Sequence, residues 1–222
     1  MSASSVGVAV QPTSTSPNSA RALLACGAAA APVFVVVVLA QGLSRAGFDF
    51  FKHPISLLSV GGPGWVQISN FIVTGLLFFA GAIGVRRRLG TGRAGTWGPR
   101  LLGAFGVALV AGGVFVADPA LGFPPGTPEG LPDEFTWHGM LHAVAPVAGF
   151  LALSVACFVF ARRAAGRQQR AWAAFCVFVG VAIQLLGAVP NVNGNFLFLT
   201  SAMVLGFGWA SVQIGWLMTE VK

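Results

Sequence analysis

The sequence predicts an all-α integral membrane protein, a polytopic bundle of about six transmembrane helices with both termini in the cytoplasm. Composition is the first observation behind this prediction. Of the 222 residues, 55% are apolar and only 9% are charged, whereas a soluble domain carries about 25% charged residues. So little charge cannot cover a water-soluble particle of this size. The second observation is that long apolar runs alternate with short arginine clusters, which is typical of multi-pass membrane proteins.

The chain divides into two parts of unequal length. Residues 1–20 carry no charge and show no helical period, so we expect a disordered N-terminal tail. Residues 21–222 are expected to form one six-helix transmembrane domain. A spanning helix needs about 20 mostly apolar residues, and about 17 is near the minimum. Six segments reach this length, at about residues 22–43, 65–85, 101–117, 137–160, 171–189 and 196–218.

The positions of lysine and arginine predict the orientation, because short cytoplasmic loops carry an excess of both. With the N-terminus inside, the outer segments hold only Arg45 and Lys52 of the 13 basic residues. We therefore expect a multi-pass protein of the plasma membrane, which in a bacterium is the inner membrane. Nucleic-acid binding is disfavoured, because it needs a basic patch on a folded soluble surface. Cys26, Cys157 and Cys176 lie inside apolar runs, which favours helix packing over disulfides.

The two longer outer loops, at about residues 44–64 and 118–136, are the natural place for a site. The second loop contains five prolines, which exclude a helix and stiffen the chain. We therefore expect an ordered cap over the outer ends of the helices.

Histidine is rare in this chain, and its positions suggest a metal site. His53, His138 and His142 all map to the outer ends of helices or to the adjoining loops. His138 and His142 are four residues apart, which places them on one helix face about 6 Å apart at Cβ. Helical zinc sites use this spacing. With Asp118 as a fourth ligand or as general base, the set would bind zinc and activate a water to hydrolyse a lipid ester or amide.

Other polar residues near the outer ends have weaker interpretations. Ser56 could supply a hydroxyl for catalysis, and Asp49 could line the same pocket. Gln67 and Asn70 lie in the outer half of the second span, where they would line the pocket or join neighbouring helices by hydrogen bonds. The histidines themselves have a plainer alternative, in which they lie at the polar boundary of the membrane and bond to loop backbone or water.

Several motifs together resemble a known family. They are HPISLLS at 53–59, WVQ at 65–67, Asp118-Pro119 before the proline-rich loop, and WHGMLH at 137–142. The chain resembles the bacterial six-helix membrane family known only as domain of unknown function 998, over about residues 22–218. This resemblance implies an integral membrane protein with an outward-facing polar cluster, and it implies no particular reaction. The chemistry of the site is also similar by analogy to transmembrane hydrolases related to alkaline ceramidases, whose histidine pair lies in a different helix.

Three hypotheses for function remain open at this point. The first is a non-transporting membrane protein with an outward-facing His/Asp site, acting as a metal-dependent hydrolase of lipids. The second is a non-catalytic membrane scaffold or interaction protein. The third is a small-solute transporter, which is less favoured because no span carries an acid or base near its middle. Membrane lipids are the expected partners, and nothing in the sequence identifies a protein partner.

Overall fold

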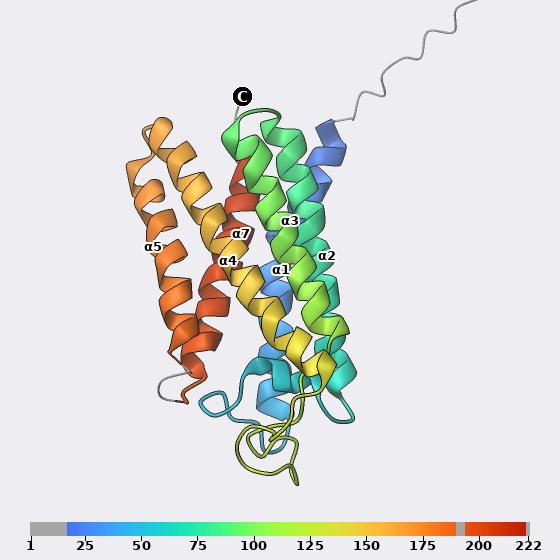
Figure 1. Cartoon of the computed structure of the whole chain (residues 1–222). Coiled ribbons are helices and arrows are strands. Elements are labelled where there is room, and N and C mark those ends of the chain that lie inside the picture. Colours follow the sequence, from blue (N-terminus) through green and yellow to red (C-terminus); the bar gives the residue numbers. More distant parts are fainter. Residues whose placement is uncertain (1–16, 190–193, 221–222) are drawn as a thin grey trace, which may run out of the picture.

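The described part of the chain is all-helical. The structure is a computed structural model and describes residues 17–189 and 194–220. Six of its helices are long and apolar enough to cross a membrane (Figure 1), as predicted. They are α1 (Pro17–Ser44), α2 (Gly64–Leu89), α3 (Arg93–Val114), α4 (Trp137–Gly166), α5 (Arg170–Ala188) and α7 (Leu197–Thr219), and a short 3-10 helix, η1 (Ile55–Ser59), precedes α2.

Several helices have bounds that differ from the prediction, and α2 and α4 continue past their predicted ends to Leu89 and Gly166. α1 begins at Pro17, inside the segment expected to be disordered, because proline suits the first turn of a helix and the turn extends beyond the apolar run. The rest of that segment lies outside the described residues. α3 begins at Arg93 and ends at Val114, so it starts earlier and ends earlier than its apolar run. Helix ends can carry charges once they leave the hydrocarbon region, which an apolar window does not detect.

The helices pack in the order of the chain, and the last closes the bundle against the first. Each of α1 to α5 contacts its successor, and α7 packs against α1 and α5. Glycine allows the closest approach, since a Cβ on Gly75 of α2 would lie 2.5 Å from the Gly106 carbonyl of α3. α4 crosses α7, and the two helices separate toward one end of the bundle (Figure 1).

The centre of the bundle is filled by aromatic side chains. The rings of Phe78, Phe105 and Phe207 come from three helices and are each at most 2% exposed. Their centroids lie 5.0 to 5.8 Å apart, within the range of favourable aromatic contacts. Phe34 of α1 adds a fourth ring, 4.8 Å from Phe207. Outside this core, many large apolar side chains of the spans are exposed, as a lipid-facing surface requires.

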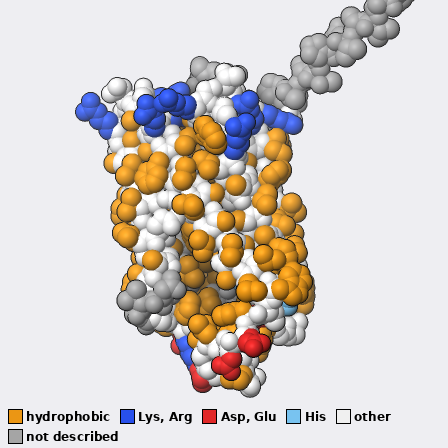
Figure 2. Space-filling model, in the orientation of Figure 1, with side chains coloured by type: hydrophobic (Ala, Val, Ile, Leu, Met, Phe, Trp, Pro, Cys, Tyr) orange, Lys and Arg blue, Asp and Glu red, His pale blue; other side chains and the backbone are white. Residues whose placement is uncertain are grey.

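Charge separates the two ends of the bundle. Lysine and arginine gather at one end, which we call the arginine-rich end, and acidic side chains gather at the other, which we call the loop end (Figure 2). The start of α1 and the end of α7 both lie at the arginine-rich end (Figure 1). The two long loops and all three histidines lie at the loop end, so the predicted gathering of imidazoles at one end is confirmed.

Candidate functional site

The two long loops, residues 45–63 and 115–136, fold over each other at the loop end, and together we call them the cap. Arg45 holds the first loop in shape: its Nη1 and Nη2 donate to the carbonyls of Leu58 and Val60 at 2.6 and 2.7 Å. Its guanidinium also lies 4.8 Å from the ring centroid of Phe123 in the second loop. Burial lowers the pKa of Arg45, and these contacts compensate the desolvated cation. The expectation of an ordered cap is therefore confirmed.

His53 is a structural residue of the cap. It is only 2% exposed, and both of its ring nitrogens have backbone partners. Nδ1 accepts the N–H of Asp49 at 2.9 Å, and Nε2 lies 3.0 Å from the Leu121 carbonyl, to which it donates. The ring packs between Phe48 and Phe123 with centroids 5.5 and 5.4 Å away. With both nitrogens bonded, His53 has no lone pair to offer a metal.

Asp118 supports the start of α4. Its Oδ1 accepts the hydroxyl of Thr136 at 2.6 Å, and its Oδ2 accepts the backbone N–H of Thr136 at 2.9 Å. Thr136 is the N-cap of α4 and in turn accepts the N–H of Gly139 at 3.1 Å. A carboxylate at a helix N-terminus is favoured by the positive end of the helix dipole. The predicted base or ligand is therefore engaged in capping.

The pair His138 and His142 binds the end of α3. Nδ1 of His138 lies 3.1 Å from the Val116 carbonyl, and Nδ1 of His142 lies 3.0 and 2.6 Å from the carbonyls of Gly112 and Phe115. Because a carbonyl only accepts, both Nδ1 atoms must carry hydrogen. The last carbonyls of a helix have no partner within it, and here the imidazoles of α4 contact those of Gly112 and Phe115 and the next one along the chain, that of Val116.

The predicted zinc site is not formed by these side chains. Among residues 17–189 and 194–220, no three His, Cys, Asp or Glu residues are grouped so that they could hold a metal ion. His53 bonds through both nitrogens, Asp118 caps α4, and the other two imidazoles turn Nδ1 toward α3. The plainer alternative, in which histidines bond to loop and helix-end backbone, matches the contacts.

The other predicted pocket residues also have structural contacts. Gln67 accepts from Gln41 of α1 at 2.8 Å, and Asn70 donates to the Phe34 carbonyl of α1 at 3.2 Å. Both are buried between α1 and α2, which matches the interhelical alternative rather than the pocket-lining one. Asp49 is exposed and accepts the N–H of Phe51 at 2.8 Å, as in a local turn.

An apolar cavity lies beside His142, where α4 and α7 separate. We call it the His142 cavity; its volume is about 70 Å³, and α2, α3, α4, α7 and residues 54–56 form its walls. Ser56 lines it and is the only hydroxyl there, while His142 is its only ionisable side chain. His142 is 8% exposed. With Nδ1 bonded to α3, its Nε2 is the nitrogen left for a ligand, and in this tautomer Nε2 accepts.

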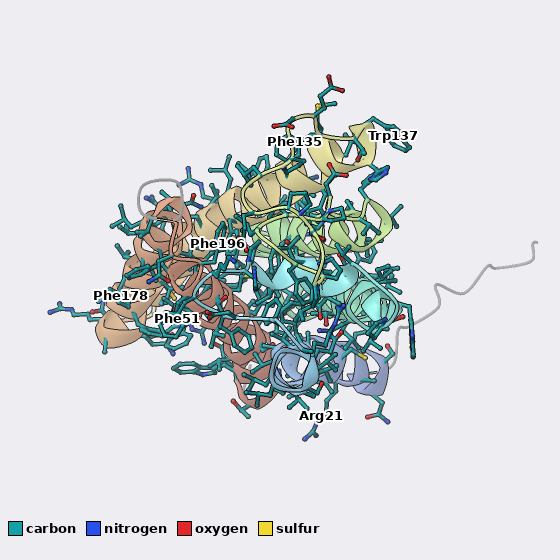
Figure 3. The ribbon with its side chains drawn as sticks, turned by 90° about the horizontal axis from the view of Figure 1, so that it is seen from below. Arg21, Phe51, Phe135, Trp137, Phe178 and Phe196 are labelled. Carbon is teal, nitrogen blue, oxygen red and sulfur yellow. The ribbon has the colours of Figure 1, made fainter. Side chains whose placement is uncertain are left out.

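A second apolar space, the α7 groove, lies on the other side of α7. It has a volume of about 300 Å³ between α1, α7 and the first loop. Ile55 and Met203 line both spaces, so these two side chains lie at the boundary that the spaces share. Phe51 closes the groove from the cap, and its carbonyl accepts the N–H of Phe196 just before α7 at 2.8 Å. Figure 3, seen from the loop end, shows both residues close to α7 and Trp137 at a distant edge of the bundle.

This fold and site define a class: a multi-pass helical membrane protein with an apolar, histidine-bearing cavity beneath a folded cap. The chain belongs to the family described as Protein of unknown function (DUF998), whose model matches residues 28–220. This finding confirms the resemblance seen in the sequence. No curated protein and no solved structure matches the chain.

Proposed function

We propose that this protein is a non-transporting membrane protein that binds a lipid at the loop end of α7. In this proposal the arginine-rich end faces the cytoplasm and the loop end faces the outside of the plasma membrane, following the distribution of lysine and arginine. The proposal rests on an apolar cavity in which His142 is the one ionisable side chain. Nδ1 of His142 donates to carbonyls at the end of α3, so its Nε2 remains available to a ligand.

The dimensions and lining favour an aliphatic chain as the bound group. The α7 groove offers about 300 Å³ and the His142 cavity about 70 Å³, and a chain could pass between them if Met203 moved. Methionine adapts readily because its side chain is unbranched and flexible. Since Nε2 of His142 accepts a hydrogen bond, the matching ligand carries an O–H or N–H donor close to its aliphatic chain.

The aromatic core does not favour a function as a solute transporter. Phe78, Phe105 and Phe207 fill the middle of the bundle between the His142 cavity and the arginine-rich end. A solute path would require these buried rings to separate. Binding from the side, where α4 and α7 diverge, requires no such change.

Lipids that co-purify with the protein test this proposal. Protein extracted in mild detergent is analysed by native mass spectrometry, and bound lipids are identified from the same sample. Ala108→Leu, which fills the His142 cavity, should remove most of the bound lipid. His142→Gln keeps an N–H for the α3 carbonyls but removes Nε2, and should weaken binding about fivefold, the value of a hydrogen bond of about 1 kcal/mol.

His138→Gln is the matched control, because His138 lies one turn away and does not line the cavity. It should leave the bound lipid unchanged. Equal occupancy in wild type, Ala108→Leu and His142→Gln would contradict the proposal. Each variant is first shown to be folded by its thermal unfolding in detergent.

Lipid hydrolysis is a second candidate, because Ser56 and His142 line the same cavity. The Ser56 hydroxyl would attack an ester carbonyl while Nε2 of His142 takes its proton, and this proton would pass to the departing alcohol as the ester C–O bond breaks. Water would then cleave the acyl-serine ester, which releases the fatty acid and restores the serine hydroxyl. Incubation of the purified protein with ester lipids tests this. Free fatty acid that forms with wild type and not with Ser56→Ala supports hydrolysis, and intact lipid in both samples supports binding alone.

A further inference from the structure

A separate groove lies at the opposite end of the molecule, on the lipid-facing surface between α2 and α3. We call it the arginine groove; its volume is about 660 Å³. Arg86, Arg87 and Arg100 line its outer part. Phe79, Ile83 and Val107 line the part nearer the middle of the bundle and are 43%, 39% and 55% exposed.

The groove exists because small residues line its floor. Ala82 and Gly103 line it and are buried, and Ala104 lines it from an exposed position. A Cβ on Gly103 would meet only ordinary contacts, with Phe79 ring carbons at 3.7 Å. The hollow is therefore a feature of the surface between two tightly packed helices, and it runs from the apolar span to the cationic end.

Charge decides what can occupy the groove. Its lining includes three arginines and no carboxylate. Arg86 has a structural role, since its Nη1 donates hydrogen bonds to the carbonyls of Gly90 and Gly95 at 2.5 and 2.8 Å. Arg87 is exposed and contacts the Ser19 hydroxyl at 3.1 Å, while Arg100 is exposed and lies 5.4 Å from the Trp97 ring centroid. Neither forms an ion pair within the described residues.

We propose that the arginine groove binds one anionic phospholipid, with its phosphate between Arg87 and Arg100 and an acyl chain along Phe79, Ile83 and Val107. Arginine recognises phosphate through charge-assisted hydrogen bonds, and basic pockets between spans are known to hold anionic headgroups. The apolar part selects a lipid over free phosphate. This site is independent of the His142 cavity.

Lipid binding to the protein is measured in nanodiscs or by native mass spectrometry. Phosphatidylglycerol is the anionic lipid, phosphatidylcholine is the lipid without net charge, and inorganic phosphate is the soluble anion for comparison. Wild type should bind one phosphatidylglycerol in preference to phosphatidylcholine. The double change Arg87→Gln with Arg100→Gln should weaken that binding about tenfold or more, since each basic side chain near the membrane surface contributes about a fivefold change in affinity. Ala104→Phe, which fills the groove from its exposed side, should weaken it without changing any charge.

Arg162→Gln with Arg167→Gln is the matched control, because it removes the same charge from the same end outside the groove. This control should bind the lipid as wild type does. An equal loss of phosphatidylglycerol binding in the control and in Arg87→Gln with Arg100→Gln would show that the whole arginine-rich end attracts the lipid, and it would overturn the proposal. Binding of phosphate that equals binding of the lipid, or no effect of Ala104→Phe, would overturn the role of the apolar groove.

Discussion

Nδ1 of His142 lies 2.6 Å from the carbonyl oxygen of Phe115, one residue beyond the end of α3. Together with the 3.0 Å contact to the Gly112 carbonyl, this contact gives two carbonyls at the end of α3 a hydrogen-bond donor. It also orients the imidazole, because a proton held on Nδ1 leaves Nε2 as an acceptor at the cavity. One side chain therefore joins the fold of the loop end to the proposed binding site.

Replacing His142 by alanine is expected to destabilise the protein by about 2–3 kcal/mol. The change leaves the carbonyls of Gly112 and Phe115 without their donor, and a buried unpaired group costs about 1–3 kcal/mol. Reversible unfolding in mixed micelles measures the difference. His138→Ala should cost less, because His138 is only half-buried. An equal loss in the two variants would contradict this assignment.

Removing the imidazole of His53 is expected to loosen the cap while leaving the spans folded. His53→Phe keeps an aromatic ring between Phe48 and Phe123 but removes the bonds to Asp49 and Leu121. Limited proteolysis should then cut residues 115–136 at least several times faster than in wild type. Lys52→Ala is the control, since its exposed ion pair with Glu129 contributes little. Unchanged cleavage in His53→Phe would show that the cap does not depend on these bonds.

Changes at Asp118 are expected to act through the N-terminus of α4. Asp118→Ala should cost about 1–2 kcal/mol, because the Thr136 N–H and hydroxyl lose their acceptor. Asp118→Asn retains one acceptor oxygen and should cost about half as much. Thermal unfolding followed by circular dichroism compares the two. If both variants unfold like wild type but lose an activity, the carboxylate has a chemical role instead.

The ion pair between Arg163 and Glu220 predicts a dependence of stability on pH. Its closest contact is 2.6 Å, and the side chains are only 16% and 12% exposed. The hydrogen bond from Arg163 lowers the pKa of Glu220, with burial opposing it and the attraction of Arg163, Arg167 and Arg88 adding to it. A carboxylate with a lowered pKa stabilises the fold above its ordinary pKa, and this contribution is lost as the pH falls through the lowered value.

Glu220→Gln should therefore be less stable than wild type at pH 7, by about 2 kcal/mol for a charge-assisted pair, and the difference should shrink below about pH 4. Melting temperatures of both proteins between pH 7 and pH 3 measure this. A difference that stays constant over that range would mean that Glu220 contributes through packing alone.

The sequence predicted the architecture well because the membrane imposes simple requirements. Apolar runs long enough to span revealed the six spanning helices of the described residues, and the motifs around His53 and His138 identified the family. The bounds of α3 were missed, since Arg93 and Arg100 lie in its helix although charge ends an apolar window. Residue type alone does not show where a helix leaves the hydrocarbon.

The zinc site could not be judged from sequence because the competing partners are backbone carbonyls. The spacing of His138 and His142 places them on one helix face whether they bind a metal or the end of α3. Their acceptors, at Gly112, Phe115 and Val116, are backbone groups that every residue carries. The predicted end of the third span, at about residue 117, lay three residues beyond the real end of α3 at Val114, so the sequence did not show which carbonyls the histidine pair would meet.

Photo-cross-linking shows which side chains a lipid acyl chain contacts. A lipid with a diazirine in its acyl chain is incorporated with the protein in bilayers, activated by light, and mapped by peptide mass spectrometry. The proposal predicts labels concentrated on α7 around Met203 and on α4 near Pro146, which both line the His142 cavity, and their loss in Ala108→Leu. Labels spread evenly over the lipid-facing side of α5, around Phe178, and unchanged in Ala108→Leu would contradict it.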